Sequence, residues 1–246
     1  MTAVRLAFLI AGLFCANILF SQCKLTDIDL DRVPYKKIRK FIKDQQTSHI
    51  LEFSDIQPSC DKDQDLSEFK EVVDTFITDV CMDQVWEAYK TTSPVQSWNG
   101  RIIAFGLQFS KWQDEILYSN GDNFSEIDTG QVFFVNLKLM RFYNLAVGLE
   151  IVNVDISNRT IKFSYIKGNK SEGEQTIQFM ALENGNTKII HSSSFRSGSK
   201  LRDRIYPFFH TKALNEFHGN ILKSLNNNDI AFQQQSAYNI AADTFD

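Results

Sequence analysis

The sequence predicts an α+β fold in which a curved antiparallel sheet of six to seven strands is closed by one long C-terminal helix. The first observation is a series of runs rich in β-branched and aromatic residues within 149–197, separated by short polar turns. The second is a long amphipathic stretch at 199–225, which has the spacing of a single helix. A helix lying across a curved sheet commonly encloses an apolar cavity, so we expect a binding site between the two.

The first 22 residues have the pattern of a secretory signal peptide. Arg5 precedes an apolar run, and Ser21 is a small residue suited to cleavage. The run is shorter than the ~20 apolar residues that span a bilayer, which favours a cleaved signal over a membrane anchor. We therefore expect an exported protein, either periplasmic or secreted.

Cys23 leaves lipid anchoring to a membrane open as the less favoured alternative, because a lipoprotein signal also ends immediately before a cysteine. That signal normally places a small residue before the cysteine, where this chain has Gln22. Of the cysteines that remain after cleavage, we predict that Cys60 pairs with Cys81, which would tie the leading segment to the main domain. Unpaired thiols are the alternative.

The composition bears on the classes of partner and site. The net charge is −4 and the basic residues are scattered, which argues against nucleic acid as a partner. No group of residues has the spacing of zinc ligands and no glycine-rich phosphate loop occurs, so neither a metal nor a cofactor is predicted. With 43% hydrophobic residues and 21 phenylalanines, the chain can fill a core or line an apolar cavity.

Residues 23–66 are expected to form an N-terminal extension with one basic amphipathic helix, capped by Asp31. The apolar face of this helix consists of Ile38, Phe41 and Ile42. A helix packed on the main domain is the preferred interpretation, and a helix lying on an anionic membrane surface is the alternative. The polar, turn-rich stretch at 57–67 marks the expected boundary before the main domain at 67–225.

The main domain is expected to begin with a strand at 68–80 and a helix, containing VWEAY, that Pro94 ends. Strand-like runs follow at 101–109, 115–120, 132–140, 149–156, 160–166, 174–182 and 187–195, and six to seven of all these runs are expected to form the sheet. The run after 132 is expected to break near Asn144, since polar residues interrupt it there. Three turns are expected, at Asn120–Gly121, at Ser157–Asn158 and at 183–186.

The closing helix is expected to start after Ser199, a possible cap, with Pro207 tolerated near its start or kinking it. Residues 226–246 are polar and repetitive, and are expected to form a loosely held tail.

Three stretches of the main domain resemble a known family. TFITDVCMDQVWEAYKTTSPVQSW, at 75–98, looks like the opening of START-like, polyketide-cyclase-like domains, the SRPBCC superfamily, which begin with a strand, a V-W-x-A-like helix and a following tryptophan, here Trp98. FSYIKGNKSEGEQTIQF, at 163–179, resembles a bacterial subfamily of unknown function in its aromatic, Gly and Gly-Glu spacing. SGSKLRDRIYPFFHTKALNEFH, at 197–218, stands where that subfamily has its closing helix.

This resemblance covers residues 68–225 and implies the helix-grip fold, a bent antiparallel sheet wrapped around a C-terminal helix with a cavity between them. It also implies binding of a lipid or other apolar small molecule. Some members catalyse cyclisation or hydrolysis, but their catalytic residues vary and match none in this chain.

Alternation along the strands and the apolar face of the closing helix indicate ligand-binding candidates that face the cavity. They are Tyr165, His191, Phe163, Phe179, His210 and Phe217. The resemblance adds Trp98, the tryptophan that follows the opening helix. Tyr165 and His191 would then be polar tips that orient a ligand in an apolar cavity. The alternative is that both are hydrogen-bonded core residues, and a core role is also the ordinary expectation for His210.

The leading hypothesis is an exported protein that holds a lipid or other apolar small molecule. A cavity enzyme of the cyclase or hydrolase type is one alternative, and it requires Tyr165, His191 or Glu174 to converge on one open space for acid–base chemistry. The chain has no G-x-S-x-G element. A non-enzymatic envelope interaction protein is the other alternative, and it would have a filled core and an exposed apolar patch.

Overall fold

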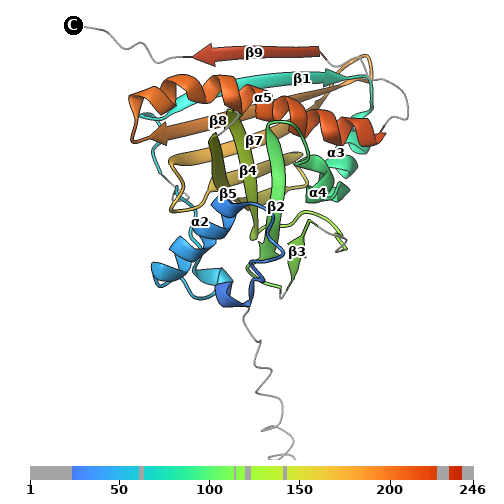
Figure 1. The fold of residues 1–246 in the computed structure, drawn as a ribbon. Helices are drawn as coiled ribbons and strands as arrows, with labels where there is room; N and C mark the ends of the chain where they lie inside the picture. The colour runs from blue at the N-terminus through green and yellow to red at the C-terminus, as the bar shows by residue number, and fades with distance from the viewer. Residues whose placement is uncertain are drawn as a thin grey trace, which may run out of the picture.

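A computed structural model describes residues 24–60, 64–113, 115–119, 123–140, 143–225 and 233–239. It confirms the predicted helix-grip fold, because one antiparallel sheet is crossed by a long C-terminal helix, α5 (Lys200–Leu225) (Figure 1). The predicted signal peptide at 1–22, Cys23 and the predicted turn at Asn120–Gly121 lie outside the described residues.

Within the described residues the sheet has nine strands, more than the six to seven predicted, in the order β3-β2-β4-β5-β6-β7-β8-β1-β9. All neighbouring strands are antiparallel. The strands are β1 (Lys70–Thr78), β2 (Ile103–Ser110), β3 (Ile116–Tyr118), β4 (Gln131–Met140), β5 (Tyr143–Asp155), β6 (Thr160–Tyr165), β7 (Ser171–Ala181), β8 (Thr187–Ser197) and β9 (Gln233–Asn239). The expected break near Asn144 falls just before it, between β4 and β5.

Strand β9 was not predicted, since it lies in the segment expected to be a loosely held tail. It pairs along β1, from Glu71 opposite Asn239 to Ile77 opposite Gln233. Its sequence, QQQSAYN, is polar and lacks the apolar alternation by which a strand is recognised. Backbone pairing along the β1 edge therefore positions this strand.

Two short helices follow β1 and pack against α5. Helix α3 (Met82–Thr91) is the expected VWEAY helix. Pro94 ends that stretch as predicted but also begins the four-residue helix α4 (Pro94–Ser97), where a proline at the first position is favourable. Among the residues that the structure describes, no helix combines the length and the apolar character needed to cross a bilayer.

Helix α5 starts directly after Ser199, as predicted, and the Ser199 carbonyl accepts a hydrogen bond from the Asp203 N–H at 3.0 Å. Pro207 lies inside the helix, two turns from its start. Because proline has no N–H, the carbonyl four residues earlier receives no helical hydrogen bond from it. The first two turns of α5 are therefore less firmly tied to the rest of the helix.

The buried face of α5 and the inner face of the sheet share one hydrophobic core. Its largest fully buried members include Phe76, Trp86, Ile103 and Phe133, which come from β1, α3, β2 and β4. Helix α5 contributes Leu214, Phe217 and Ile221 to the same core. Burial of these side chains is the main term that holds the helix on the sheet.

The N-terminal extension covers the outer face of the same sheet. Helix α2 (Lys36–Thr47) buries Ile38, Phe41 and Ile42 against β4 and β5, and two short turns, η1 (Leu25–Asp27) and η2 (Phe53–Asp55), flank it. Sheet residues Leu107, Phe109, Val132 and Phe134 complete this second core. The helix therefore packs on the domain, as preferred, and its apolar face is not available to a membrane surface.

Two glycines allow the extension to approach the sheet closely. A Cβ at Gly106, which lies in a β-bulge of β2, would stand 2.2 Å from Ile38 Cδ1. A Cβ at Gly148 would stand 2.5 Å from Ile166 Cδ1 and 3.1 Å from Phe41 Cε1. Both strands thus lack a side chain where the second core is tightest.

Two local predictions are wrong. Asp31 does not cap α2, which begins at Lys36 after Tyr35. Pro34 disfavours helical geometry at the residue before it, and the Asp31 N–H instead donates to Asp29 Oδ1 at 3.0 Å in a turn.

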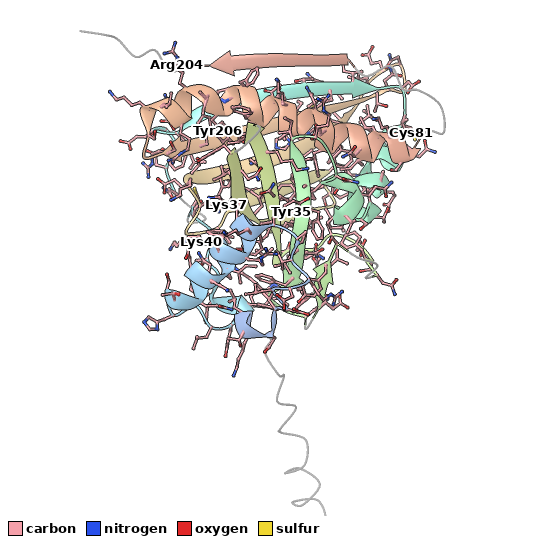
Figure 2. The ribbon with its side chains drawn as sticks, viewed as in Figure 1. Tyr35, Lys37, Lys40, Cys81, Arg204 and Tyr206 are labelled. Atoms are coloured by element: carbon pink, nitrogen blue, oxygen red, sulfur yellow. The ribbon has the colours of Figure 1, made fainter. Side chains whose placement is uncertain are left out.

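The predicted disulfide is the second error, because Cys60 is a buried free thiol and Cys81 an exposed one. Cys60 lies near the start of β1. Its neighbour Ser59 donates a hydrogen bond to the Gly173 carbonyl, Gly173 of β7 lies opposite Phe195 of β8, and Phe195 lies opposite Lys70, the first residue of β1. Cys81 follows the other end of β1, near the far end of the molecule in Figure 2. Nine strand residues at ~3.4 Å each separate the two sulfurs, far beyond disulfide reach.

Glu216 ties the middle of α5 to the loop before β2. Its carboxyl oxygens accept hydrogen bonds from the backbone N–H groups of Arg101 at 2.9 Å, Ile102 at 2.7 Å and Ile103 at 3.0 Å. Gly100 makes room for this contact, since a Cβ there would stand 2.0 Å from Glu216 Oε2.

Replacement of Glu216 by alanine is expected to lower the free energy of unfolding by about 2–4 kcal/mol, because three backbone donors lose a common acceptor. Urea unfolding of the purified variant measures this. Glu87→Ala is the matched control, since its side chain is 58% exposed and forms a surface ion pair with Lys90. A cost at Glu216 no larger than that of the control would show that the loop is held by other contacts.

Candidate functional site

A cavity of about 100 Å³ lies between α5 and the inner face of the sheet. Its walls are mainly apolar, with Val135, Leu137, Leu145, Val147, Leu149 and Leu214 among the residues that line it. A cavity of this size holds several water molecules or one apolar ring. It is the space that the sequence predicted between the helix and the sheet.

The lining of the cavity has a buried polar part, here called the inner end, and an exposed part, here called the mouth. The inner end consists of the buried Tyr165, Gln175 and His210 and the partly buried Tyr206. The mouth includes the exposed Lys170, on the β6–β7 connection, and the exposed Ile205, on α5. An apolar ligand with one polar group therefore has only one orientation in which both of its parts find suitable surroundings.

Arg202 also lines the cavity, and its side chain does not pair with that of its neighbour Asp203. Arg202 donates to the Lys170 carbonyl, and Asp203 accepts from the Ser197 hydroxyl at 2.6 Å. These contacts fix the start of α5 to the end of β8 and to the β6–β7 connection.

The inner end of the cavity is part of a continuous row of hydrogen-bonded side chains, here called the polar chain. Its members, in order, are Tyr89, His218, His191, Gln175, Tyr165, Tyr206, Ser193 and His210. They come from α3, α5, β8, β7 and β6. The polar chain thus joins the two layers of the fold through an otherwise apolar core.

One half of the polar chain runs from the cavity into the core. Gln175 Nε2 lies 2.9 Å from the Tyr165 hydroxyl, and Gln175 Oε1 lies 2.9 Å from His191 Nε2. His191 Nδ1 lies 2.9 Å from His218 Nε2, and His218 Nδ1 lies 2.5 Å from the Tyr89 hydroxyl. Every polar atom on this path has a partner.

The other half runs along the inner end of the cavity. The Tyr165 hydroxyl lies 2.6 Å from the Tyr206 hydroxyl, which lies 3.3 Å from Ser193 Oγ. Ser193 Oγ lies 3.1 Å from His210 Nε2. His210 Nδ1 has no hydrogen-bond partner and lies 3.9 Å from Oδ2 of the fully buried Asp74.

Burial keeps the titratable members of the polar chain uncharged at neutral pH. It lowers the pKa of His218 to about 3 and that of His210 to about 4, although Asp74 opposes the second shift. Burial, reinforced by His218 and His210, also lowers the pKa of His191. Burial raises the pKa of Tyr165 to about 12. Each histidine therefore has one ring nitrogen that donates and one that accepts.

With neutral groups, the polar chain has a single favourable direction. Tyr89 donates to His218, the donations continue through Gln175 to the tyrosines, and Ser193 donates to His210 Nε2. The His210 Nδ1 proton then points towards Asp74. The opposite direction would leave the Tyr89 proton without an acceptor among these contacts and turn a His210 lone pair towards the Asp74 oxygens.

Ser193, His210 and Asp74 stand in the order of a nucleophile, base and carboxyl group of an acyl-transfer triad. Two observations argue against that role. Ser193 is fully buried and is absent from the cavity lining, with Tyr206 in contact with its hydroxyl. The 3.9 Å between His210 Nδ1 and Asp74 Oδ2 is too long for a hydrogen bond. No nucleophile is therefore assigned.

Three of the predicted ligand-binding residues, Trp98, Tyr165 and His210, line the cavity. His191 is buried behind Gln175 and reaches the cavity only through it. His191 is thus a hydrogen-bonded core residue, although its partners are side chains and not the backbone.

The predicted phenylalanines lie deeper. Phe163 and Phe217 line a separate void of about 20 Å³ that also touches Trp98. Phe179 packs edge-on against Trp86, with ring centroids 5.5 Å apart. These rings build the core below the cavity.

Glu174 does not join the other candidates for acid–base chemistry. It neighbours Gln175 on β7 and so points to the opposite face of the sheet, where it pairs with Lys162 at 2.7 Å. The three residues that a cavity enzyme was expected to bring together, Tyr165, His191 and Glu174, therefore do not converge on one open space.

Sequence reasoning missed Gln175, Tyr206 and Asp74. A signal for one of them was present, because Asp74 alternates with the buried Val72 and Phe76 and so occupies an inward position of β1. A charged residue at an inward strand position is unusual enough to mark a polar site. Tyr206 gave no comparable signal, since it lies on the amphipathic helix among other aromatic residues.

No protein family matches the chain, and no curated protein does either. Solved structures with a similar arrangement do exist. Norcoclaurine synthase from Thalictrum flavum is 12% identical with a TM-score of 0.48, covering 69% of this chain and 96% of its own.

A conserved protein from Geobacillus kaustophilus is 11% identical with a TM-score of 0.45, covering 67% and 98% of the two chains. Ara h 8.0201 is 15% identical with a TM-score of 0.44, covering 63% and 99%. Identities and scores this low carry nothing about ligand or reaction. The helix-grip fold is recognised from the strand order and the closing helix themselves.

Proposed function

We propose that this START-like helix-grip protein is a binding protein that holds an apolar small molecule bearing one neutral polar group. The observation that carries the proposal is the cavity with apolar walls, a polar inner end and an open mouth. Apolar contact with the walls supplies the affinity, at ~25 cal/mol per Å² of apolar surface removed from water. The polar inner end sets the orientation. Export is an additional expectation, which rests on residues 1–22 alone.

The size of the cavity limits the part of the ligand that enters it. An engineered cavity of about 150 Å³ is known to hold benzene, so about 100 Å³ with an open mouth suits one ring or a short chain. A longer apolar tail would extend past Ile205 at the mouth. The ligand is thus expected to be elongated, with its polar group at the inner tip.

The direction of the polar chain limits the chemistry of that polar group. Tyr165 and Tyr206 use their protons inside the polar chain, so towards a ligand they offer mainly oxygen lone pairs. Gln175 retains a second amide N–H. A hydroxyl both donates and accepts, and therefore matches this set better than an ether. A charged group would be disfavoured by burial among neutral partners.

Three related probes test the proposal: 4-butylphenol, its methyl ether and butylbenzene, titrated by calorimetry into the purified full chain. All three are expected to bind. The phenol is expected to bind about fivefold more tightly than the other two, because one net hydrogen bond is worth ~1 kcal/mol.

A blocking variant locates the site. Leu145 is a partly buried residue of β5 that lines the cavity, so Leu145→Trp places a bulky ring in the cavity. This variant is expected to bind all three probes about tenfold or more weakly than the wild-type chain. Ile156→Trp is the matched control, since Ile156 follows the same strand but is 63% exposed and does not line the cavity. Equal binding to both variants, or no binding of any probe to the wild-type chain, would overturn the proposal.

Material that copurifies with the protein gives a second test. Solvent extraction followed by mass spectrometry is expected to identify an apolar hydroxylated compound that is absent from the Leu145→Trp preparation. An identical extract from both preparations would mean that the compound binds elsewhere.

A further inference from the structure

Large apolar side chains lie exposed around the cavity mouth. On α5, Leu201, Ile205 and Phe208 are 69%, 37% and 57% exposed, and their spacing places them on one face of the helix. Ile205 also lines the mouth itself. Across the mouth, Tyr143 is 48% exposed and lies two residues before the cavity residue Leu145, on the same face of β5.

These four residues, Leu201, Ile205, Phe208 and Tyr143, are here called the mouth rim. Single exposed apolar residues are ordinary on a protein surface, but a group that surrounds the opening of a cavity is not. The rest of the helix surface does not continue the pattern, since the buried face of α5 packs on the core.

The charge around the mouth rim is opposite in sign to that of the whole chain. Residues 200–212 contain four cations and one acidic residue, whereas the chain carries a net charge of −4. The cations are Lys200, Arg202, Arg204 and Lys212. Asp203, the acidic residue, is engaged by Ser197. Arg204 lies at the same end of α5 as Tyr206 in Figure 2.

Cations and apolar side chains alternate closely on this part of α5. The Lys212 Nζ stands 3.9 Å above the Phe208 ring, so that one long flexible cation lies beside an exposed ring. A helix face of this kind is suited to a lipid surface, where apolar groups enter the acyl boundary and flexible cations meet the lipid phosphates.

We propose that the mouth rim docks this protein on the surface of a bilayer that contains anionic lipid. In that position the cavity mouth faces the acyl region, so an apolar molecule passes between bilayer and cavity without crossing water. The sign of the charge favours anionic lipid, since each cation near such a surface adds to the attraction. Helix α2 has no part in docking, because its apolar face is buried on the sheet.

Flotation with two kinds of vesicle tests the docking. One kind is phosphatidylcholine alone, and the other contains phosphatidylglycerol as well. The full chain is expected to bind the mixed vesicles at least several-fold more strongly, and added salt is expected to weaken this binding by screening. Absence of binding to the mixed vesicles overturns the proposal and leaves the mouth rim as a surface for a protein partner.

Paired variants locate the docking surface. Ile205→Ala with Phe208→Ala is expected to weaken binding to the mixed vesicles about tenfold or more, because two apolar side chains no longer enter the bilayer. Arg204→Gln with Lys212→Gln is expected to abolish the preference for anionic lipid. The matched control, Leu51→Ala with Ile156→Ala, removes two side chains that are 56% and 63% exposed away from the mouth. Equal weakening by the control overturns the proposal.

Docking and ligand binding are separable. Leu145→Trp blocks the cavity but leaves the exposed face of α5 unchanged, so it is expected to bind mixed vesicles as well as the wild-type chain does. If the wild-type chain binds vesicles but takes up no probe, the binding function is refuted and docking is supported. If it takes up the probes but binds no vesicles, docking is refuted and the binding function is supported.

Discussion

The free energy of unfolding is expected to fall steeply as the pH drops below about 6.5, because the polar chain holds three histidines neutral inside the core. Burial lowers the pKa of His191, brings that of His210 to about 4 and brings that of His218 to about 3. In the unfolded chain a histidine has a pKa of about 6.5. The unfolded state therefore binds three protons that the folded state does not.

The sign of the effect follows from the lowered pKa values. A group whose pKa is depressed on folding contributes stability above its unfolded pKa, and this stability is lost as the pH falls towards the folded pKa. The stability is therefore lost over the pH range from about 6.5 down to about 4, and near pH 4 His210 also takes up a proton in the folded state. Three protons give a slope of about 4 kcal/mol per pH unit.

Urea unfolding at several pH values between about 6.5 and 5 measures this slope, since most carboxyl groups titrate below that range. His218→Gln is expected to lower the slope by about one third, whatever its effect on stability at neutral pH. His49→Asn is the matched control: His49 is exposed and has a positive φ of 62°, which asparagine tolerates. A slope that corresponds to the uptake of one proton or less on unfolding would mean that the histidines are not held neutral in the core.

Replacing Ile38 or Ile42 by alanine is expected to lower the free energy of unfolding by about 2–5 kcal/mol, although both lie in the N-terminal extension, outside the domain that the sequence resembles. Both side chains are fully buried between α2 and the outer face of the sheet. Each substitution leaves a void that the surrounding side chains refill only in part. Such losses are large beside the total stability of an ordinary domain.

Leu51→Ala is the matched control for these substitutions, since Leu51 belongs to the same extension but is 56% exposed. Chemical unfolding followed by tryptophan fluorescence compares the three variants. Both isoleucine variants are expected to shift one cooperative transition, because the extension and the domain share the sheet. A separate early transition, with the main one unchanged, would show that the extension unfolds by itself.

The sequence predicted the parts of the fold that local pattern determines. The strand-like runs, the VWEAY helix and the long closing helix follow from periodicity, although six to seven strands were predicted and nine are present in the described residues. The turn predicted at 183–186 is also present, and Gly185 has a positive φ of 83° there. Strand β9 was missed because pairing with β1, and not its own polar sequence, places it. The packing of α2 on the outer face of the sheet was predicted only in part. The sequence showed the apolar face of α2, but no local pattern indicates which surface of the domain it packs against.

The candidate site depends even more on tertiary contacts. Gln175 and Ser193 are ordinary polar residues in sequence, and the β7–β8 register places them opposite each other. The same kind of register places Asp74 of β1 opposite His191 of β8. Tyr206 joins them only because α5 crosses the sheet at that point. Strand alternation indicated Tyr165 and His191, and the helix face indicated His210, so these three members of the polar chain were predicted from the sequence.

Pro207 has a kinetic consequence for whatever occupies the cavity. The helical segment before it carries Arg202, Ile205 and Tyr206, which line the cavity, and lacks the hydrogen bond that would tie it to the following turn. Release of two helical turns is a local event, far faster than unfolding of the sheet. Motion of this helix end widens the mouth, so we expect the residence time of a bound molecule to depend on a local motion more than on the global stability of the fold.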